Sequence, residues 1–240
     1  MKKNNSSGKI SGSILVSLIS FLVYSLSLFP IIIGIYLVLS LIKFNQIWHF
    51  LLLPFLAYIG ITTTLFFLVI ISGIFIYIFR IKYEPGTYEY NYKNKMAFRW
   101  ILICFLYTPI RKLFEIFLIG KMKNWYYKML GMKIGKNSLV GGTIIDPCLT
   151  EIGDNCTMGL FAVIYGHIHD YEKGLIIMDK VKIGDNCIIG AGSIIMPGAV
   201  IENNVKLATG SIVKKDQVLK KGKVYGGVPA KEIKSKNNKK

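Results

Sequence analysis

The sequence predicts a membrane-spanning α-helical hairpin followed by an all-β domain, a left-handed parallel β-helix built from hexapeptide repeats. Two observations lead to this fold class. Residues 13–42 and 50–79 contain no charged side chain, and from Ile134 an apolar residue returns about every six positions. The composition agrees, because 52% hydrophobic residues and a mean hydropathy of +0.47 exceed what a soluble domain normally carries.

The hairpin is predicted over residues 13–80, after a basic tail at residues 1–12. Each uncharged run is longer than the roughly 20 residues that cross the hydrocarbon core of a bilayer. Both runs should therefore span the membrane as helices, with tilt and with possible kinks at Pro30 and Pro54.

The distribution of charge orients this hairpin. Lysines precede the first run, Arg80 and Lys82 follow the second, and the connection at residues 43–49 holds a single lysine. The positive-inside rule places both termini and the β-helix in the cytoplasm, on the inner face of the cell membrane. The net charge of +17 lies mostly beside the apolar runs and in the tail at residues 231–240. It therefore fits membrane lipids as partners better than nucleic acid.

Residues 81–130 are predicted to form an interfacial amphipathic linker. Charged side chains interrupt the apolar stretch 97–119, and each central charge in a spanning helix costs about 2.5–3.5 kcal/mol. We expect two short in-plane helices, with a break at Thr108-Pro109 and a stop at Gly120. A third membrane span is the alternative.

The six-residue repeat predicts a β-helix over residues 131–230, because neither a helical nor a strand period gives this spacing. Asp146 interrupts the apolar series. Glycine follows several of the apolar residues, where a close turn favours the absence of a Cβ.

Eighteen residues make one three-faced coil, which predicts coils over residues 134–151, 152–169, 183–200 and 201–218. The intervening stretch, 170–182, has no repeat signature and should project as a loop. The repeating positions are Ile134, Val140, Ile152, Met158, Ile164, Ile183, Ile189, Ile195, Ile201, Leu207 and Val213.

Several motifs resemble the hexapeptide-repeat acyltransferase superfamily. They are Ile183-Gly-Asp-Asn-Cys-Ile, Ile189-Gly-Ala-Gly-Ser-Ile, Met196-Pro-Gly-Ala-Val and Tyr225-Gly-Gly-Val-Pro-Ala. The resemblance implies a homotrimer that transfers an acyl group from a coenzyme A or carrier thioester, with its site between neighbouring β-helices. The lead-in Glu84-Pro-Gly-Thr-Tyr and Leu130-Gly-Met-Lys-Ile are similar to the membrane-bound modules of ε-polylysine-synthetase-like proteins. This chain departs from those modules in having one hairpin and one repeat region.

Two histidines are the candidates for the general base that acyl transfer requires. His167 and His169 lie where the coils give way to the loop, and residues two apart on a strand project to the same face. The segment from His169 to Glu172 resembles the His-x-x-Glu stretch of the polylysine-synthetase-like modules, and Gly166-His167 resembles the Gly-His of sugar acetyltransferases. The sequence favours His169, with His167 as the alternative and Glu172 or Asp170 orienting the imidazolium. A His-x-His-Asp metal site is a further reading, but no additional ligand cluster is visible, so no metal is expected.

The acyl donor, expected to be acetyl-CoA, would bind coils beyond the loop. Backbone N–H groups near Ala191 and Gly192 could meet its pantetheine arm, and Lys214 or Lys215 could meet a nucleotide phosphate. The function predicted is O- or N-acetyl transfer to a surface-polysaccharide or lipid-linked sugar. An aminoacyl or peptide-forming module that uses a carrier-bound thioester is one alternative. A non-catalytic trimeric envelope scaffold is the other.

Overall fold

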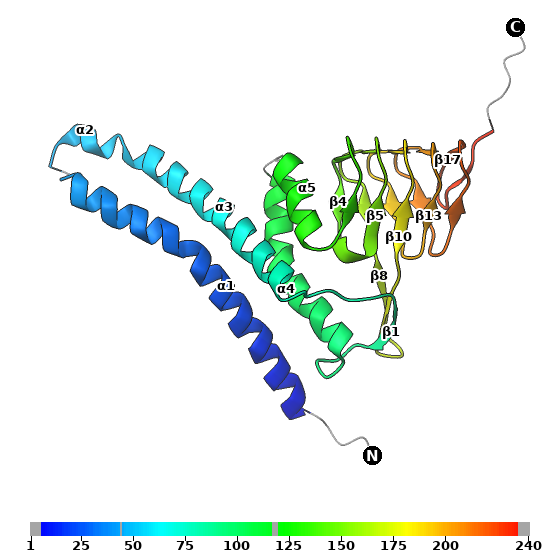
Figure 1. The fold of residues 1–240 in the computed structure, drawn as a ribbon, viewed down its shortest axis with the longest axis horizontal. Coiled ribbons are helices and arrows are strands. Elements are labelled where there is room, and N and C mark those ends of the chain that lie inside the picture. Colours follow the sequence, from blue (N-terminus) through cyan, green and yellow to red (C-terminus); the bar gives the residue numbers. More distant parts are fainter. Residues whose placement is uncertain (1–5, 44, 117–119, 235–240) are drawn as a thin grey trace, which may run out of the picture.

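The computed structural model describes residues 6–43, 45–116 and 120–234. Two long helices, α1 (Ser6–Leu41) and α3 (Leu53–Ile78), form the predicted hairpin. The short α2 (Ile47–Phe50) lies at its tip (Figure 1). The start of α1 and the end of α3 lie at the opposite end from this tip, on the side of the molecule that carries the β-strands (Figure 1). The hairpin therefore presents its tip away from the rest of the chain.

Both long helices are apolar enough to cross a membrane, over Ser11–Leu41 and Ile47–Ile78 with hydropathies of 2.3 and 2.4. Most side chains of α1 are exposed, and each long helix has one buried stripe, which faces the other long helix and the helices α4 and α5 that follow. Pro54 lies in the first turn of α3, so it begins this helix instead of kinking it, since that position needs no N–H donor. The buried stripe residues are Val16, Ser20, Val23 and Ser27 on α1, and Val69, Ser72, Gly73 and Ile76 on α3.

The linker forms one long helix and one short helix, α4 (Lys95–Ile116) and α5 (Gly120–Met129). The predicted break at Pro109 is wrong, because α4 continues through this residue. Residues 106, 110 and 114 of α4 form a buried apolar face, and their packing outweighs the single N–H that the proline lacks. Gly120 begins α5 instead of ending a helix. Residues 117–119 of the predicted segment lie outside the described residues.

These two helices close one end of the β-helix. The Tyr107 hydroxyl donates to the Ile144 carbonyl at 2.5 Å, the Lys123 ammonium to the Gly142 carbonyl at 2.6 Å, and the Asn124 amide to Ser138. All three carbonyls belong to the first coil, which has no preceding coil to cover it. The linker thus satisfies polar groups and covers apolar surface that an isolated β-helix would expose.

The β-helix, called the prism below, consists of three parallel sheets, as the six-residue spacing predicts (Figure 1). The first sheet contains β2 (Lys133–Ile134), β5 (Thr150–Ile152), β10 (Val181–Ile183), β13 (Val200–Ile201) and β16 (Val218–Leu219). The second contains β3 (Leu139–Val140), β6 (Thr157–Met158), β11 (Ile188–Ile189), β14 (Lys206–Leu207), β17 (Val224–Gly226) and the antiparallel β18 (Lys231–Glu232). The third contains β4 (Thr143–Ile144), β7 (Val163–Ile164), β12 (Ile194–Ile195) and β15 (Ile212–Val213).

Residues of the apolar series stack on one another in successive coils. Ile183, for example, is in register with Ile152 on one side and Ile201 on the other, and all three are buried. The left-handed β-helix predicted from the sequence is therefore the fold of this domain.

The glycines that follow the apolar residues are explained by the close approach of the coils. A Cβ on Gly190 would lie 2.4 Å from the backbone nitrogen of Thr209 and 2.6 Å from the carbonyl carbon of Ala208. The backbone of Gly190 needs no positive φ, so coil stacking alone excludes a side chain there. The left-handed positions of the first four turns between the first and second sheets carry asparagine, which tolerates that conformation, and the last such turn carries Gly222. The asparagines are Asn137, Asn155, Asn186 and Asn204.

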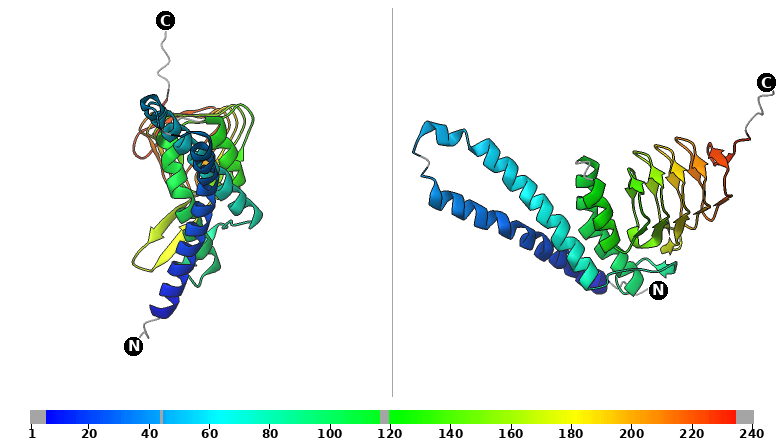
Figure 2. Two further views of the ribbon diagram at one scale, coloured as in Figure 1. Left: turned by 90° about the vertical axis from the view of Figure 1, so that its left-hand side faces the viewer. Right: turned by 45° about the horizontal axis from the view of Figure 1, so that its top comes forward.

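The predicted loop is an ordered antiparallel hairpin, β8 (His167–Asp170) and β9 (Leu175–Met178). It projects from the side of the prism (Figure 2). It begins at His167, earlier than the sequence predicts, because the Asp179 N–H donates to the Gly166 carbonyl at 2.8 Å and closes its base. The strand β1 (Gly86–Glu89), which precedes α4, pairs with β9 and makes a three-stranded sheet.

Candidate active site

A buried carboxylate stands at the centre of the site. Asp146 follows β4 at the end of the first coil and is fully buried. Burying a carboxylate is costly unless hydrogen bonds replace its water. Its Oδ1 accepts from the Tyr83 hydroxyl at 2.7 Å and the Trp100 indole N–H at 3.2 Å. Its Oδ2 accepts from the Gly166 N–H at 2.8 Å and lies 2.7 Å from Nδ1 of His167.

These donors keep Asp146 ionised. Burial alone would raise the pKa of the Asp146 carboxyl, but the hydrogen bond and charge of His167, with the bonds from Tyr83 and Gly166, bring it below its ordinary value. Burial, and then the charge of Asp146, raise the pKa of Tyr83 well above its ordinary value. The tyrosine therefore stays protonated and donates to the carboxylate.

The carboxylate sets the tautomer of His167. An ionised carboxylate only accepts hydrogen bonds, so the Nδ1 of His167 must carry the proton that joins them. Nε2 is then the nitrogen that can accept a proton. The side chain of His167 is 11% exposed, and the Trp100 ring meets it edge-on with 4.7 Å between centroids. This imidazole is held in one orientation with one nitrogen free to act as a base.

His169 lies beside His167, with 5.3 Å between the ring centroids, as expected for residues two apart on a strand. Its Nδ1 is buried without a hydrogen-bond partner in the described part of the chain. The ring contacts Tyr90, Trp100 and Tyr171 at centroid distances of 4.8, 5.2 and 5.3 Å. Burial and the charge of His167 lower its pKa. His169 is therefore packed among aromatic rings and is not oriented by a carboxylate.

The acids predicted to orient the imidazolium lie elsewhere. Glu172 is exposed at the tip of the hairpin, and no described contact joins it to either imidazole. Asp170 pairs with Lys173 at 3.4 Å. Asp146, which takes the orienting position, appears in the sequence only as the residue that interrupts the apolar series. That interruption is the signal from which it could have been found.

The residues considered as metal ligands do not converge. Within the ranges that the structure describes, no three His, Cys, Asp or Glu side chains gather in a way that could hold a metal ion. In the His-x-His-Asp stretch, Nδ1 of His167 is taken by Asp146, and Asp170 faces Lys173.

The lysines predicted to meet the acyl donor share an edge of the prism with His167. Val213 is in register with Ile195, and Ile195 with Ile164, so the residues after these strands stack along one edge. Lys215 pairs with Asp216 at 2.5 Å, and no ion pair reaches the Lys214 ammonium among the described residues. Ala191 and Gly192 follow β11 in the second sheet and lie at a different edge.

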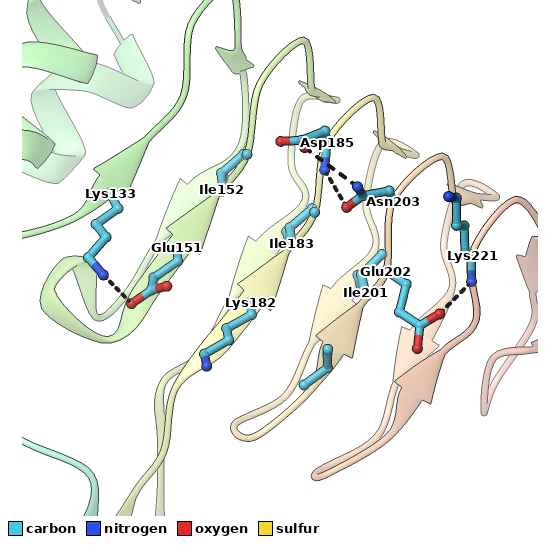
Figure 3. Close-up of a pocket in the computed structure, with 13 residues that line it drawn as sticks. Lys133, Glu151, Ile152, Lys182, Ile183, Asp185, Ile201, Glu202, Asn203 and Lys221 are labelled. Atoms are coloured by element: carbon cyan, nitrogen blue, oxygen red, sulfur yellow. Dashed lines mark hydrogen bonds and ion pairs between the residues drawn. The ribbon is translucent and has the colours of Figure 1, made fainter.

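A shallow groove of about 610 Å³ crosses the outer face of the first sheet (Figure 3). Several of its charged residues are held by neighbouring groups of the prism. Lys133 meets Glu151 at 3.0 Å, and Glu202 accepts from the Lys221 backbone N–H at 2.9 Å. No histidine lines this groove, so it is separate from the His167 site.

The chain is similar to known transferases over the prism. Residues 176–215 match the family described as bacterial transferase hexapeptide (six repeats). Over 123 residues the chain is 36% identical to YvoF of Bacillus subtilis (strain 168), which is named as an acetyltransferase. The match covers 48% of this chain and 67% of YvoF.

Two further relatives match shorter regions. The galactoside O-acetyltransferase of Escherichia coli (strain K12) is 34% identical over 101 residues, which are 40% of this chain and 49% of that enzyme. The mitochondrial gamma carbonic anhydrase 2 of Arabidopsis thaliana is 35% identical over 82 residues, 34% of this chain and 24% of that protein.

Proposed function

The chain belongs to the bacterial hexapeptide-repeat transferase family, and we propose that it is a membrane-anchored acyltransferase that moves an acetyl group from acetyl-CoA to a sugar. The pair formed by Asp146 and His167 carries this proposal, because it supplies the oriented base that acyl transfer needs. The relatives named as acetyltransferases support the reaction class.

In the proposed reaction, Nε2 of His167 takes the proton from a hydroxyl or amine of the acceptor. The acceptor electron pair attacks the thioester carbonyl and forms a tetrahedral intermediate with an oxyanion. Collapse of this intermediate breaks the C–S bond, and the departing coenzyme A sulfur takes the proton back from the imidazolium. Asp146 favours the imidazolium through its charge and its bond to Nδ1.

The acyl donor would lie along the edge that joins His167 to Lys214, with Lys215 beside it. The Lys214 ammonium makes no ion pair within the described ranges of the chain and could meet a phosphate of the donor. Ala191 and Gly192 lie at another edge, and the Gly192 N–H already donates to the Leu160 carbonyl at 3.0 Å. Of these two residues, Ala191 alone would offer its backbone N–H to the same donor, and only from a neighbouring prism. A homotrimer would supply that neighbour and place each site between two subunits.

The acceptor is proposed to be a sugar, because one relative is a galactoside O-acetyltransferase. The two apolar helices would hold the prism at the membrane, where a lipid-linked sugar or nascent surface polysaccharide is available. Exposed apolar side chains along α1 and α3 would face lipid.

The test uses the full-length protein in lipid nanodiscs with acetyl-CoA, without any carrier protein. Glucosamine, which offers hydroxyls and an amine, and polyprenyl-diphosphate-linked N-acetylglucosamine serve as acceptors. We expect release of the coenzyme A thiol and an acetylated sugar in the mass spectrum. No release above the uncatalysed rate would contradict the proposal. Turnover that needs a carrier-bound aminoacyl thioester would favour the peptide-forming module, and failure of coenzyme A to raise the melting temperature would favour the scaffold.

We further propose that the chain crosses the cell membrane twice, with both termini and the prism in the cytoplasm. Basic residues gather at the prism end of the hairpin, which includes Arg80 and Lys82, whereas Lys43 alone precedes the tip. Two single-cysteine additions test this orientation, Asn45→Cys at the exposed tip and Glu172→Cys on the exposed β-hairpin.

We expect a membrane-impermeant maleimide to label Asn45→Cys in intact cells and Glu172→Cys only after permeabilisation. The unsubstituted chain, whose four cysteines are buried or half-buried, gives the background. Labelling of Glu172→Cys in intact cells would reverse the proposed topology.

A further inference from the structure

Asp146 receives half of its hydrogen bonds from residues outside the prism. Tyr83 lies between α3 and β1, and Trp100 lies near the start of α4. Both donate to the same carboxylate oxygen, Oδ1, at 2.7 and 3.2 Å. The prism and the hairpin that projects from it supply only the partners of Oδ2, which are Gly166 and His167.

We propose that Tyr83 and Trp100 are positioning residues for acyl transfer, which fix the Asp146 carboxylate and through it the imidazole of His167. The catalytic base is then complete only when the segment that leads from the hairpin is docked on the prism. This inference rests on the proposed function and goes beyond it, since it assigns part of the site to the membrane-proximal segment.

The planarity of a carboxylate is the physical basis of this assignment. The two oxygens are rigidly linked, so two donors that fix Oδ1 also fix the direction in which Oδ2 meets His167. Trp100 has a second contact at this site, because its ring also meets the His167 imidazole in a T-shaped arrangement, with 4.7 Å between centroids and an interplanar angle of 68°. Loss of either donor leaves a buried carboxylate oxygen with one partner fewer and allows the carboxylate to turn.

The segment that leads from the hairpin to α4 also supports, through β1 and β9, the strand that carries His167. In the three-stranded sheet, Gly86 of β1 is in register with Met178 of β9, and Met178 is in register with His167. The Arg99 guanidinium donates to the Lys82 carbonyl at 3.1 Å and ties the start of α4 to the chain just before Tyr83. The docked segment therefore holds both the carboxylate and the backbone of the base.

A purely structural role for these donors makes a different prediction. Buried Tyr and Trp side chains need hydrogen-bond partners wherever they occur, so their bonds to Asp146 could serve folding alone. Tyr126 offers a matched control. It is also fully buried, and its hydroxyl lies 3.2 Å from that of Ser72. Among the described residues no hydrogen bond joins Tyr126 to Asp146 or His167.

The experiment compares Tyr83→Phe, Trp100→Phe and Tyr126→Phe in nanodiscs, with acetyl-CoA and whichever of the two acceptors above is turned over faster. We expect Tyr83→Phe and Trp100→Phe each to lower kcat about tenfold, the size of one hydrogen bond to a charged group, while KM for acetyl-CoA stays unchanged. Tyr126→Phe should change kcat less than twofold, even if it lowers the melting temperature by as much as Tyr83→Phe and Trp100→Phe do.

A double-variant comparison separates positioning from packing. In an Asp146→Asn background, Tyr83→Phe should cause no further loss of kcat, because the group that it positions is already impaired. Full kcat in both Tyr83→Phe and Trp100→Phe, or an unchanged tenfold loss in the Asp146→Asn background, would overturn the inference. Full activity of His167→Ala would instead overturn the assigned base, so the two failures are distinguishable.

Discussion

Replacing His167 with alanine is expected to lower kcat of acetyl transfer by about 10²–10⁴-fold, the contribution of a positioned general base. His167 is bonded to an ionised, fully buried carboxylate, which leaves its Nε2 available to take the acceptor proton. The measurement is the release of coenzyme A thiol at saturating acetyl-CoA. KM for acetyl-CoA should change little, because the base acts on the acceptor.

His169→Ala is the matched comparison, since it removes the second imidazole of the same strand. Its ring is packed against Tyr90, Trp100 and Tyr171 without a carboxylate partner, so we expect at most about a tenfold loss, less than the about 10²-fold that misplacement of a reacting group can cost. The sequence alone favours His169. A larger loss in His169→Ala than in His167→Ala would return the base to that residue.

The prism could be predicted from the sequence because its pattern is local. Each apolar residue of the series lies inward in its own coil and stacks on its equivalents in the neighbouring coils, as Ile183 does on Ile152 and Ile201. The six-residue count therefore located the coils and also the one insertion. The same count placed both histidines at the end of the coil that precedes this insertion, whereas the projecting hairpin already begins at His167.

The orienting acid could not be predicted in the same way, because its partners are distant in sequence. Asp146 is 63 residues from Tyr83, 46 from Trp100 and 21 from His167. A loop acid such as Glu172 is the nearer choice when only local spacing is available. The continuity of α4 through Pro109 was missed for a related reason, since burial of one helix face is a tertiary effect that local breaker signals do not contain.

Asp146→Asn is expected to lower kcat by about 10³–10⁴-fold, the loss that follows when an Asp that orients a catalytic histidine becomes an amide. The shape of the side chain is kept. An asparagine amide, however, can donate to Nδ1 of His167, and this would place the imidazole proton on Nε2 and remove the acceptor site. Asp154→Asn is the control, because Asp154 accepts from the Lys136 backbone N–H in a turn of the prism, and an amide oxygen can replace it.

The same substitution should change how stability depends on pH. The folded pKa of Asp146 lies below the value of about 3.9 that an unfolded Asp has. Its contribution to the free energy of unfolding is therefore complete at neutral pH, and it is lost as the pH falls through the folded value. The free energy of unfolding, measured by urea titration, should therefore fall more steeply below about pH 4 for the unsubstituted protein than for Asp146→Asn, which has no carboxyl at this position to protonate. Equal slopes, together with near-normal kcat in Asp146→Asn, would mean that the carboxylate neither stays ionised in the fold nor orients His167.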